Sequence, residues 1–262
     1  MQNRIDKLFE EKRGNILSIF ITGGFPKLNG TLELIKALNT ADMIEIGIPF
    51  SDPLADGETI QQSSQQALDN GMNLSLLFEQ LKGLRAITEK PVLLMGYLNS
   101  VINYGIDKFY GDCHATGIDG VILPDLPLQE YINEHKQYAE MYNVHAVFLI
   151  SPATCAKRIQ QIDALSKGFV YLVSSNSTTG QIAIGFEQIS ALVSSLSLKN
   201  PILIGFGIKD AQTFMAATQI ANGVIIGSEY LRRIKDSTEF ATDTEKFINE
   251  IKLQKHDHSI SQ

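Results

Sequence analysis

The chain has 262 residues, which suits one large domain or two small ones, and 44% of them are hydrophobic, which is ample for a core. Its net charge of −7 and pI of about 5.3, with no basic block, argue against a nucleic-acid or anionic-membrane partner. No apolar run approaches the roughly 20 residues that a membrane span needs, and residues 1–14 lack the basic start and apolar core of a secretory signal. Two isolated cysteines, without CxxC spacing, complete the pattern of a cytoplasmic protein with reduced thiols.

The pattern of apolar residues predicts a first helix over residues 3–12 and then a regular alternation of strands and helices. Strands are expected at residues 16–22, 42–47, 91–97, 119–125, 144–150, 169–174, 201–206 and 223–226. Helices are expected between them at residues 28–39, 58–69, 74–88, 107–116, 128–142, 154–166, 186–196 and 210–219, and from residue 229 onward. Residues 254–262 are polar, and we expect them to fray.

Eight strand–helix units without a linker predict an α/β protein in which residues 1–262 form a single-domain (β/α)₈ barrel, or TIM barrel, with an extra N-terminal helix. A doubly wound parallel sheet is the structural alternative. A dinucleotide-binding sheet of that kind carries a Gly-x-Gly-x-x-Gly turn after its first strand, but here residues 22–26 read Thr-Gly-Gly-Phe-Pro.

A carboxylate stands inside the second predicted strand. Side chains alternate along a strand, so Glu45 and Gly47 face one way while Ile44 and Ile46 face the other. Burial would raise the pKa of Glu45 and let it exchange a proton near neutral pH. The alternative is an ordinary strand residue paired with a basic neighbour.

The loop after this strand, residues 49–57, adds three polar candidates, Ser51, Asp52 and Asp56. One carboxyl on a rigid strand and a second on the adjacent loop form a plausible acid–base pair, Glu45 with Asp56. Asp56 is alternatively the N-cap of the helix that starts near Glu58.

Glycines follow three consecutive strands near the end of the chain. In barrels of this type the loops after the seventh and eighth strands often bind phosphate, because glycines let the backbone N–H groups approach it. The candidates are Thr179, Gly180, Gly205, Gly207, Gly227 and Ser228. The alternative is that these glycines are ordinary turn residues.

Other chemistries lack their residues. No predicted strand carries the lysine of a Schiff-base aldolase, and the five histidines, at positions 114, 135, 145, 256 and 258, do not cluster as metal ligands. Acid–base chemistry by carboxylates remains, with Tyr171 either as a participant or as an aromatic residue of the barrel wall.

Several stretches carry a family resemblance. Residues 45–57 (EIGIPFSDPLADG) closely resemble the signature of tryptophan synthase alpha chains. Residues 91–97 (PVLLMGY), 117–127 (GIDGVILPDLP), 205–208 (GFGI) and 227–228 (GS) resemble that family as well. The matches follow the family's order along nearly the whole chain, and the first motif is long and specific.

The resemblance implies a (β/α)₈ lyase of tryptophan biosynthesis that cleaves indole-3-glycerol phosphate to indole and glyceraldehyde 3-phosphate without cofactor or metal. Glu45 would protonate the ring carbon that bears the glycerol chain and take a proton from the adjacent hydroxyl. Asp56 would accept a hydrogen bond from the ring N–H. The remaining substrate contacts implied are the indole walls and neighbours Phe20, Ile60, Leu94, Tyr171 and Phe206, and the phosphate ligands Gly180, Gly207, Gly227 and Ser228.

The resemblance also implies a partner, the pyridoxal-phosphate-containing beta chain, in an α2β2 heterotetramer. The cofactor would belong to that partner. Contacts with it would involve Pro49, Asp52 and the surroundings of Asn99.

Two regions of the sequence depart from the family pattern. The loop after the sixth strand usually reads Ser-Arg-x-Gly-Val-Thr-Gly, but residues 174–180 here read SSNSTTG, so the arginine and first glycine of this lid are absent. Glu58 replaces a common proline. The alternatives left open are a free-standing indole-releasing lyase, a phosphate-metabolite binding protein without turnover, and a sugar-phosphate isomerase, for which the apolar pocket lining is unsuited.

Overall fold

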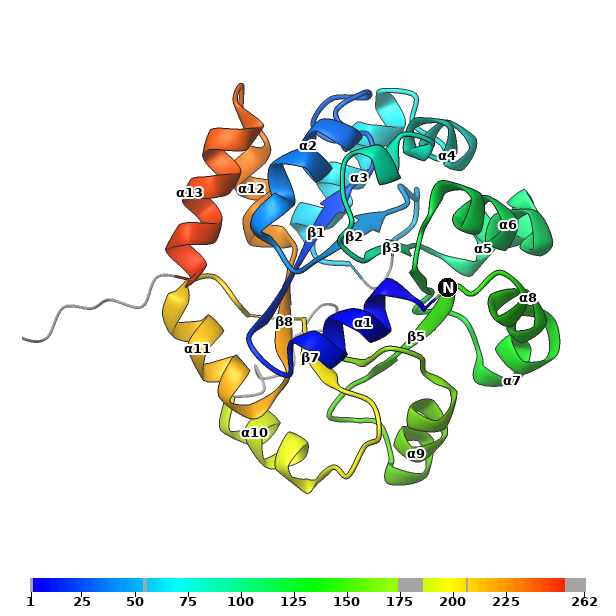
Figure 1. The fold of residues 1–262 in the computed structure, drawn as a ribbon, viewed down its shortest axis with the longest axis vertical. Coiled ribbons are helices and arrows are strands. Elements are labelled where there is room, and N and C mark those ends of the chain that lie inside the picture. The colour runs from blue at the N-terminus through cyan, green and yellow to red at the C-terminus, as the bar shows by residue number, and fades with distance from the viewer. Residues whose placement is uncertain (1, 54–55, 174–185, 206, 253–262) are drawn as a thin grey trace, which may run out of the picture.

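The computed structural model describes residues 2–53, 56–173, 186–205 and 207–252, and in them a closed barrel of eight parallel strands in chain order (Figure 1). The strands are β1 (Ile16–Thr22), β2 (Met43–Gly47), β3 (Val92–Met95), β4 (Gly120–Ile122), β5 (His145–Ile150), β6 (Val170–Leu172), β7 (Ile202–Ile204) and β8 (Gly223–Ile226). The predicted (β/α)₈ barrel is confirmed, and pairing of β1 with both β2 and β8 closes it.

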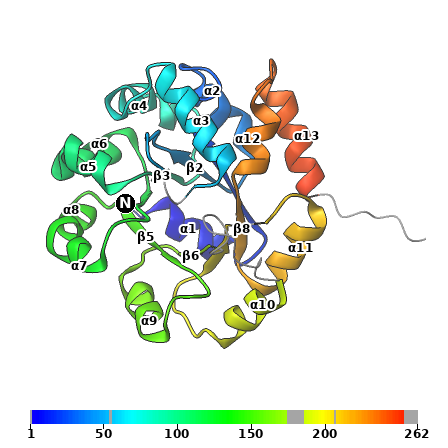
Figure 2. The same cartoon turned by 180° about the vertical axis from the view of Figure 1, so that it is seen from behind.

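Helices surround the barrel on all sides, and α1 crosses one of its ends (Figures 1 and 2). They are α1 (Arg4–Glu11), α2 (Thr31–Ala37), α3 (Glu58–Asp69), α4 (Leu74–Leu81), α5 (Leu98–Tyr104), α6 (Ile106–Thr116), α7 (Leu128–Glu130), α8 (Lys136–Met141), α9 (Ala156–Leu165), α10 (Phe186–Ser195), α11 (Ala211–Ile220), α12 (Ser228–Ile234) and α13 (Phe240–Lys252). None of the helices in the described part of the chain combines the length and apolar character that crossing a bilayer requires.

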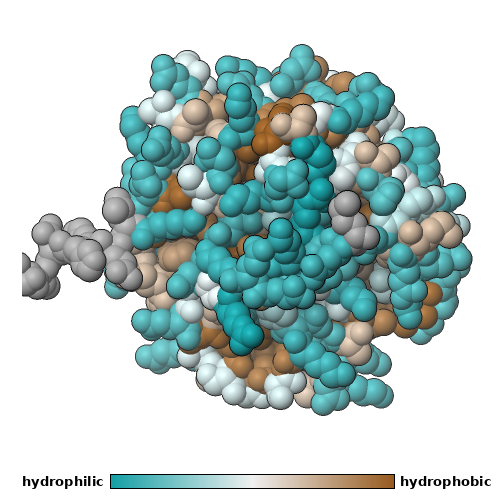
Figure 3. Space-filling model, viewed as in Figure 1, coloured by the Kyte–Doolittle hydropathy of each residue, from teal (hydrophilic) through white to brown (hydrophobic). Residues whose placement is uncertain are grey.

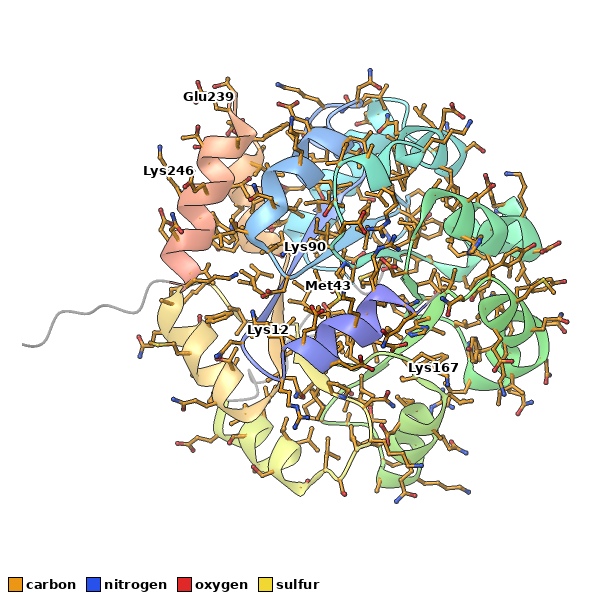
Figure 4. The ribbon with its side chains drawn as sticks, viewed as in Figure 1. Lys12, Met43, Lys90, Lys167, Glu239 and Lys246 are labelled. Carbon is orange, nitrogen blue, oxygen red and sulfur yellow. The ribbon has the colours of Figure 1, made fainter. Side chains whose placement is uncertain are left out.

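Two apolar layers follow from the alternation of side chains along the strands. Residues such as Ile44 and Ile46 pack outward against the helices. Their neighbour Met43 points into the barrel, near its axis in Figure 4. The buried members of the inner layer are Ile5, Ile16, Met43, Leu93, Ile122, Val147, Phe169, Tyr171, Leu203 and Ile225.

Helix α1 closes the end of the barrel where the strands begin. Asn3 caps the helix by accepting a hydrogen bond from the Ile5 N–H, and its amide donates to the carbonyls of Asp119 and Asn143. Ile5 is fully buried against Gly120 and Gly168, where an added Cβ would crowd its side chain. The opposite end of the barrel, where the strands finish, is therefore the end available for a ligand.

An ion-pair cluster fixes the same closed end. The buried Asp119 carboxylate accepts from Arg4 Nη1 at 3.0 Å, from Arg85 Nη2 at 2.6 Å and from the Val92 N–H at 2.9 Å. Around this end the surface is mostly hydrophilic (Figure 3), and Lys12, Lys90 and Lys167 lie along its rim (Figure 4).

Some predicted elements differ from those observed. The segment expected as one helix over 74–88 is α4 followed by a short 3₁₀-helix, Leu84–Ala86. The segment expected over 128–142 contains a π-helical turn, Tyr131–His135, which places His135 inward beside Tyr110. Helix α5 was not predicted, since its seven residues follow the third strand directly. Two helices, α12 and α13, replace the single last one. The tail at 254–262 lies outside the described residues.

Candidate active site

A cavity of about 500 Å³ opens at the ends of the strands, on the side of the barrel seen in Figure 2. All eight strands contribute to its wall, either directly or through the loops that follow them. Eight residues predicted from the sequence line it, namely Phe20, Asp56, Ile60, Tyr171, Gly205, Gly207, Gly227 and Ser228. The three predicted contacts Thr179, Gly180 and Phe206 lie outside the described residues.

The prediction that Leu94 forms part of the wall around the indole is wrong, because Leu94 does not line the cavity. Its side chain packs into the outer apolar layer between strands and helices, and the next residue, Met95, lines the cavity. A slip of one position along a strand moves a side chain to the opposite face. Met95 therefore takes the place predicted for Leu94.

Glu45 is fully buried inside the barrel. Its Oε1 accepts a hydrogen bond of 2.9 Å from the Ser18 hydroxyl, and its Oε2 has no hydrogen-bond partner among the described residues. In the register of β1 and β2, Ser18 lies opposite Met43 and Phe20 opposite Glu45. The carboxyl is thus turned one layer toward the closed end of the barrel. The observed partner is a hydroxyl rather than the basic neighbour of the alternative reading.

Burial sets the protonation state of Glu45. Loss of hydration raises its pKa to about 8, although the hydrogen bond from Ser18 acts in the opposite direction. At neutral pH the group therefore carries its proton. No described group accepts a hydrogen bond from Oε2, so no hydrogen-bond acceptor in the described part of the barrel draws the proton away from the carboxyl.

Asp56 faces the cavity from the loop before α3. Its Oδ2 accepts a hydrogen bond of 3.1 Å from the Tyr97 hydroxyl, and the Tyr97 ring stacks on Phe50 with centroids 4.9 Å apart. Burial raises the pKa of Asp56, and the Tyr97 hydrogen bond opposes this shift. The N-cap of α3 is Gly57, so the reading of Asp56 as a helix cap is wrong.

A small apolar recess of about 20 Å³ adjoins the cavity beside Asp56. It shares Phe20, Ile60 and Met95 with the main cavity and is bounded by Gly47. A Cβ at Gly47 would overlap the Phe20 ring, so this position needs glycine to leave Phe20 in place. The recess gives this side of the cavity a mainly apolar lining.

Tyr171 forms the opposite wall on β6. Burial first, and then the charges of Glu45 and Asp56, hold its pKa well above the ordinary value, so the hydroxyl stays neutral. A Cβ at Gly205 on the neighbouring strand would overlap the Tyr171 ring. Gly205 therefore serves the packing of Tyr171 as well as lining the cavity.

The far side of the cavity is built from the loops after β7 and β8. Gly207 has a φ of 66°, a left-handed conformation that favours glycine. Lys209, Glu229 and Arg232 add charges to this side. Sequence reasoning did not single out any of the three, although Arg232 follows Ser228 by four residues on α12, the spacing that puts two side chains on one helix face.

Of the three residues predicted to contact a partner, two are exposed and one is buried. Asp52 and Asn99 are exposed, and Asp52 accepts a hydrogen bond from the Ser51 hydroxyl. Pro49 is buried within the chain. Only the first two therefore lie on the surface.

Metal-binding groups are absent from the described parts of the chain, where no three His, Cys, Asp or Glu side chains gather in a suitable arrangement. His145 Nε2 lies 2.9 Å from Asp6 of α1, at the closed end. This agrees with the prediction that His145 serves packing away from the active face.

Comparisons with known proteins agree along the length of the chain. The family model described as "Tryptophan synthase alpha chain" matches residues 5–260. The alpha chain of Flavobacterium psychrophilum is 48% identical over 256 residues, 95% of this chain and 99% of that one, and the alpha chain of Parabacteroides distasonis is 43% identical over 255 residues with the same coverage. Among solved structures, the alpha chain of Legionella pneumophila superposes with a TM-score of 0.86 at 30% identity, covering 96% of this chain and 97% of that one. The aminoacrylate-bound tryptophan synthase of M. tuberculosis gives a TM-score of 0.83 at 26% identity, covering 96% and 98%.

Proposed function

Since the chain belongs to the tryptophan synthase alpha-chain family, we propose that it cleaves indole-3-glycerol phosphate in the cavity described above, with Glu45 and Asp56 as its catalytic residues. Membership makes the protein a carbon–carbon lyase of tryptophan biosynthesis. The products are indole and D-glyceraldehyde 3-phosphate. The residue roles that follow are part of the proposal.

The reaction is a retro-aldol cleavage in which the indole ring receives the bonding electrons. Glu45 donates its proton to the ring carbon that bears the glycerol chain, which makes the ring a cation. The carboxylate then takes the proton of the adjacent side-chain hydroxyl, the carbon–carbon bond breaks, and its electron pair returns to the ring as the aldehyde forms. Glu45 ends as it began, protonated. Ionised Asp56 accepts a hydrogen bond from the ring N–H and stabilises the cation.

The observation that supports this assignment is a buried, proton-bearing carboxyl inside the barrel. Glu45 does not itself line the cavity, but its strand neighbour Phe20 does, and Asp56 enters the same cavity from a loop. A pKa of about 8 keeps Glu45 an acid at neutral pH and yet lets it act as a base after one transfer. The step requires the Glu45 carboxyl to turn from Ser18 toward the substrate by rotation about its side-chain bonds. Phe20, Ile60 and Met95 supply an apolar wall for the indole.

The substrate's phosphate is assigned to the loops after β7 and β8, where Gly207, Gly227 and Ser228 border the cavity. Glycine lets backbone N–H groups come close to an anion. Gly180 and Thr179 are proposed for the same group from the sequence. The two ends of the substrate thus lie between Asp56 on one side and the glycine loops on the other.

The proposed partner is a beta chain that holds pyridoxal phosphate and consumes the indole, in an α2β2 assembly in the cytoplasm. The exposed positions of Asp52 and Asn99 support their assignment to that interface. The lyase step as written needs no cofactor of this chain's own. The altered loop at residues 174–180 lies outside the described residues, and its effect on activation by a partner is part of what the assay below measures.

The test is indole formation from indole-3-glycerol phosphate by the full chain, with and without a beta chain. We expect cleavage, faster with the partner, and a loss of at least about 10²-fold in turnover for Glu45→Gln, the lower range for general acid–base catalysis. Glu245→Gln, on the exposed face of α13, is the matched control. Equal rates with and without the beta chain indicate a free-standing lyase, phosphate binding without indole indicates a binding protein, and near wild-type turnover in Glu45→Gln removes Glu45 from the mechanism.

A further inference from the structure

Arg232 is a cation at the edge of the cavity, and it has no role in the sequence-based prediction of the site or in the proposed reaction. It lies on α12, one turn after the Gly227–Ser228 pair, and lines the cavity together with both. Its guanidinium is held from two sides, since Nη1 donates to Thr59 Oγ1 at 2.9 Å and Nη2 to Glu229 Oε2 at 2.5 Å. Arg232 is thus ordered before any ligand arrives, although about half of its side chain is exposed.

The charges around the cavity explain why a cation is needed there. Among the described lining residues, Asp56 and Glu229 are acidic, and Lys209 and Arg232 are basic. Glu229 places a carboxylate beside the loops assigned to the phosphate, where it repels a dianion. The bond from Arg232 to Glu229 offsets this repulsion, and the planar guanidinium suits phosphate oxygens.

From this geometry we infer that Arg232 is a specificity-determining residue that recognises the phosphate end of the substrate, with Thr59 and Glu229 holding its guanidinium in place. The inference rests on the proposed function. On binding, the phosphate shares the guanidinium N–H groups with Glu229, while the bond to Thr59 keeps the side chain at the cavity edge. Helices α12 and α3 lie side by side (Figures 1 and 2). The hydrogen bond from Arg232 to Thr59 therefore joins α12, which begins at the proposed phosphate loop, to α3, which begins just after Asp56.

The chain offers a matched control in the next residue. Arg233 carries the same charge on the same helix, but it pairs with Glu250 and lies over the Phe247 ring of α13, away from the cavity. Arg232→Ala and Arg233→Ala change the net charge equally. A difference between them therefore reports position rather than overall charge.

The experiment measures inorganic phosphate binding by calorimetry on the full chain, and kcat and KM for indole-3-glycerol phosphate. We expect Arg232→Ala to weaken phosphate binding and to raise KM by about tenfold each, the size for one partly screened charge, with kcat changed by less than about threefold. Arg232→Lys should recover part of the loss because it keeps the charge. Adding Glu229→Gln to Arg232→Ala should recover part as well, since it removes the uncompensated carboxylate.

Two outcomes overturn the inference. One is equal phosphate binding in Arg232→Ala and Arg233→Ala. The other is an Arg232→Lys variant that recovers none of the phosphate binding lost in Arg232→Ala, because a charge that contributes nothing leaves Arg232 only a structural role. The proposed function fails separately, through absence of indole formation by the wild-type chain, because phosphate binding is measured without turnover.

Discussion

The protonation of Glu45 has a consequence for stability that is independent of activity. The folded protein holds this proton up to about pH 8, whereas the unfolded chain releases it near the ordinary pKa of 4.5. Between these values the folded state binds one proton more than the unfolded state. The free energy of unfolding should therefore fall as pH rises through this window, and level off above it.

The change Glu45→Gln removes this titration while keeping the shape of the side chain. Integrating the difference in bound protons between the folded and unfolded states from about pH 5 to about pH 9 gives about 4 kcal/mol. The free energy of unfolding of the variant should rise by this amount relative to that of the wild type over this range. For a chain of this length, that corresponds to a relative rise of about 8 °C in the unfolding midpoint. Any constant cost of burying the amide cancels, because the same pair of proteins is compared at both pH values.

The assay is thermal and urea unfolding of both proteins at several pH values, followed by circular dichroism. Glu245→Gln on the exposed face of α13 is the control, and its effect should be independent of pH. A stability difference between Glu45→Gln and wild type that stays within about 1 kcal/mol across this range would refute the reasoning, since a buried acid with so high a pKa must produce it.

Three further changes test other parts of the structure. Ser18→Ala removes the hydrogen bond that lowers the pKa of Glu45, so the fall of kcat/KM at alkaline pH should move to higher pH. An unchanged pH profile would mean that this fall does not report the titration of Glu45. Gly205→Ala should reduce stability by about 1–3 kcal/mol, because its Cβ would overlap the Tyr171 ring; full stability in thermal unfolding would contradict this packing. Asp119→Ala should cost about 3 kcal/mol or more, because two partly buried arginines lose their partner, with kcat per folded molecule unchanged at the distant active site.

The glycine substitution has its own control. An added Cβ at Gly14 meets no atom within 4 Å, so Gly14→Ala should leave the unfolding midpoint near that of wild type. If both glycine variants unfold alike, the loss at Gly205 reflects a general backbone effect and not contact with Tyr171.

The sequence predicts some elements to the residue because local signals and tertiary packing agree. β1, β8 and α3 have the predicted bounds, since turn residues delimit them and their apolar periods are clear. The third strand is shorter than predicted, because apolar character continues through residues 96 and 97 after the backbone has left the sheet. The π-helical turn around His135 depends on what the helix packs against, which local propensity does not encode.

Some residues of the candidate site can likewise be predicted from the sequence, and others only from the packing of the strands. Glu45 stands out from the sequence because a charged residue inside an apolar strand is unusual, and Asp56 because it belongs to a long motif. Ser18 gives no such signal, since its role arises from the register between β1 and β2. Leu94 and Met95 are both apolar, so only the observed face of β3 distinguishes them.

Closure of the barrel joins the first strand to the last. β1 pairs with β8 through Ile16 and Gly223, so its second edge stays open until residue 226 has been made. At about 5–20 residues per second, a ribosome needs roughly 10–40 s to travel that far from residue 22. For this time the seven residues of β1, all buried in the finished protein, present unpaired N–H and C=O groups to other chains. We therefore expect slower translation or loss of chaperones to lower the yield of folded protein before any effect on the folded enzyme is seen.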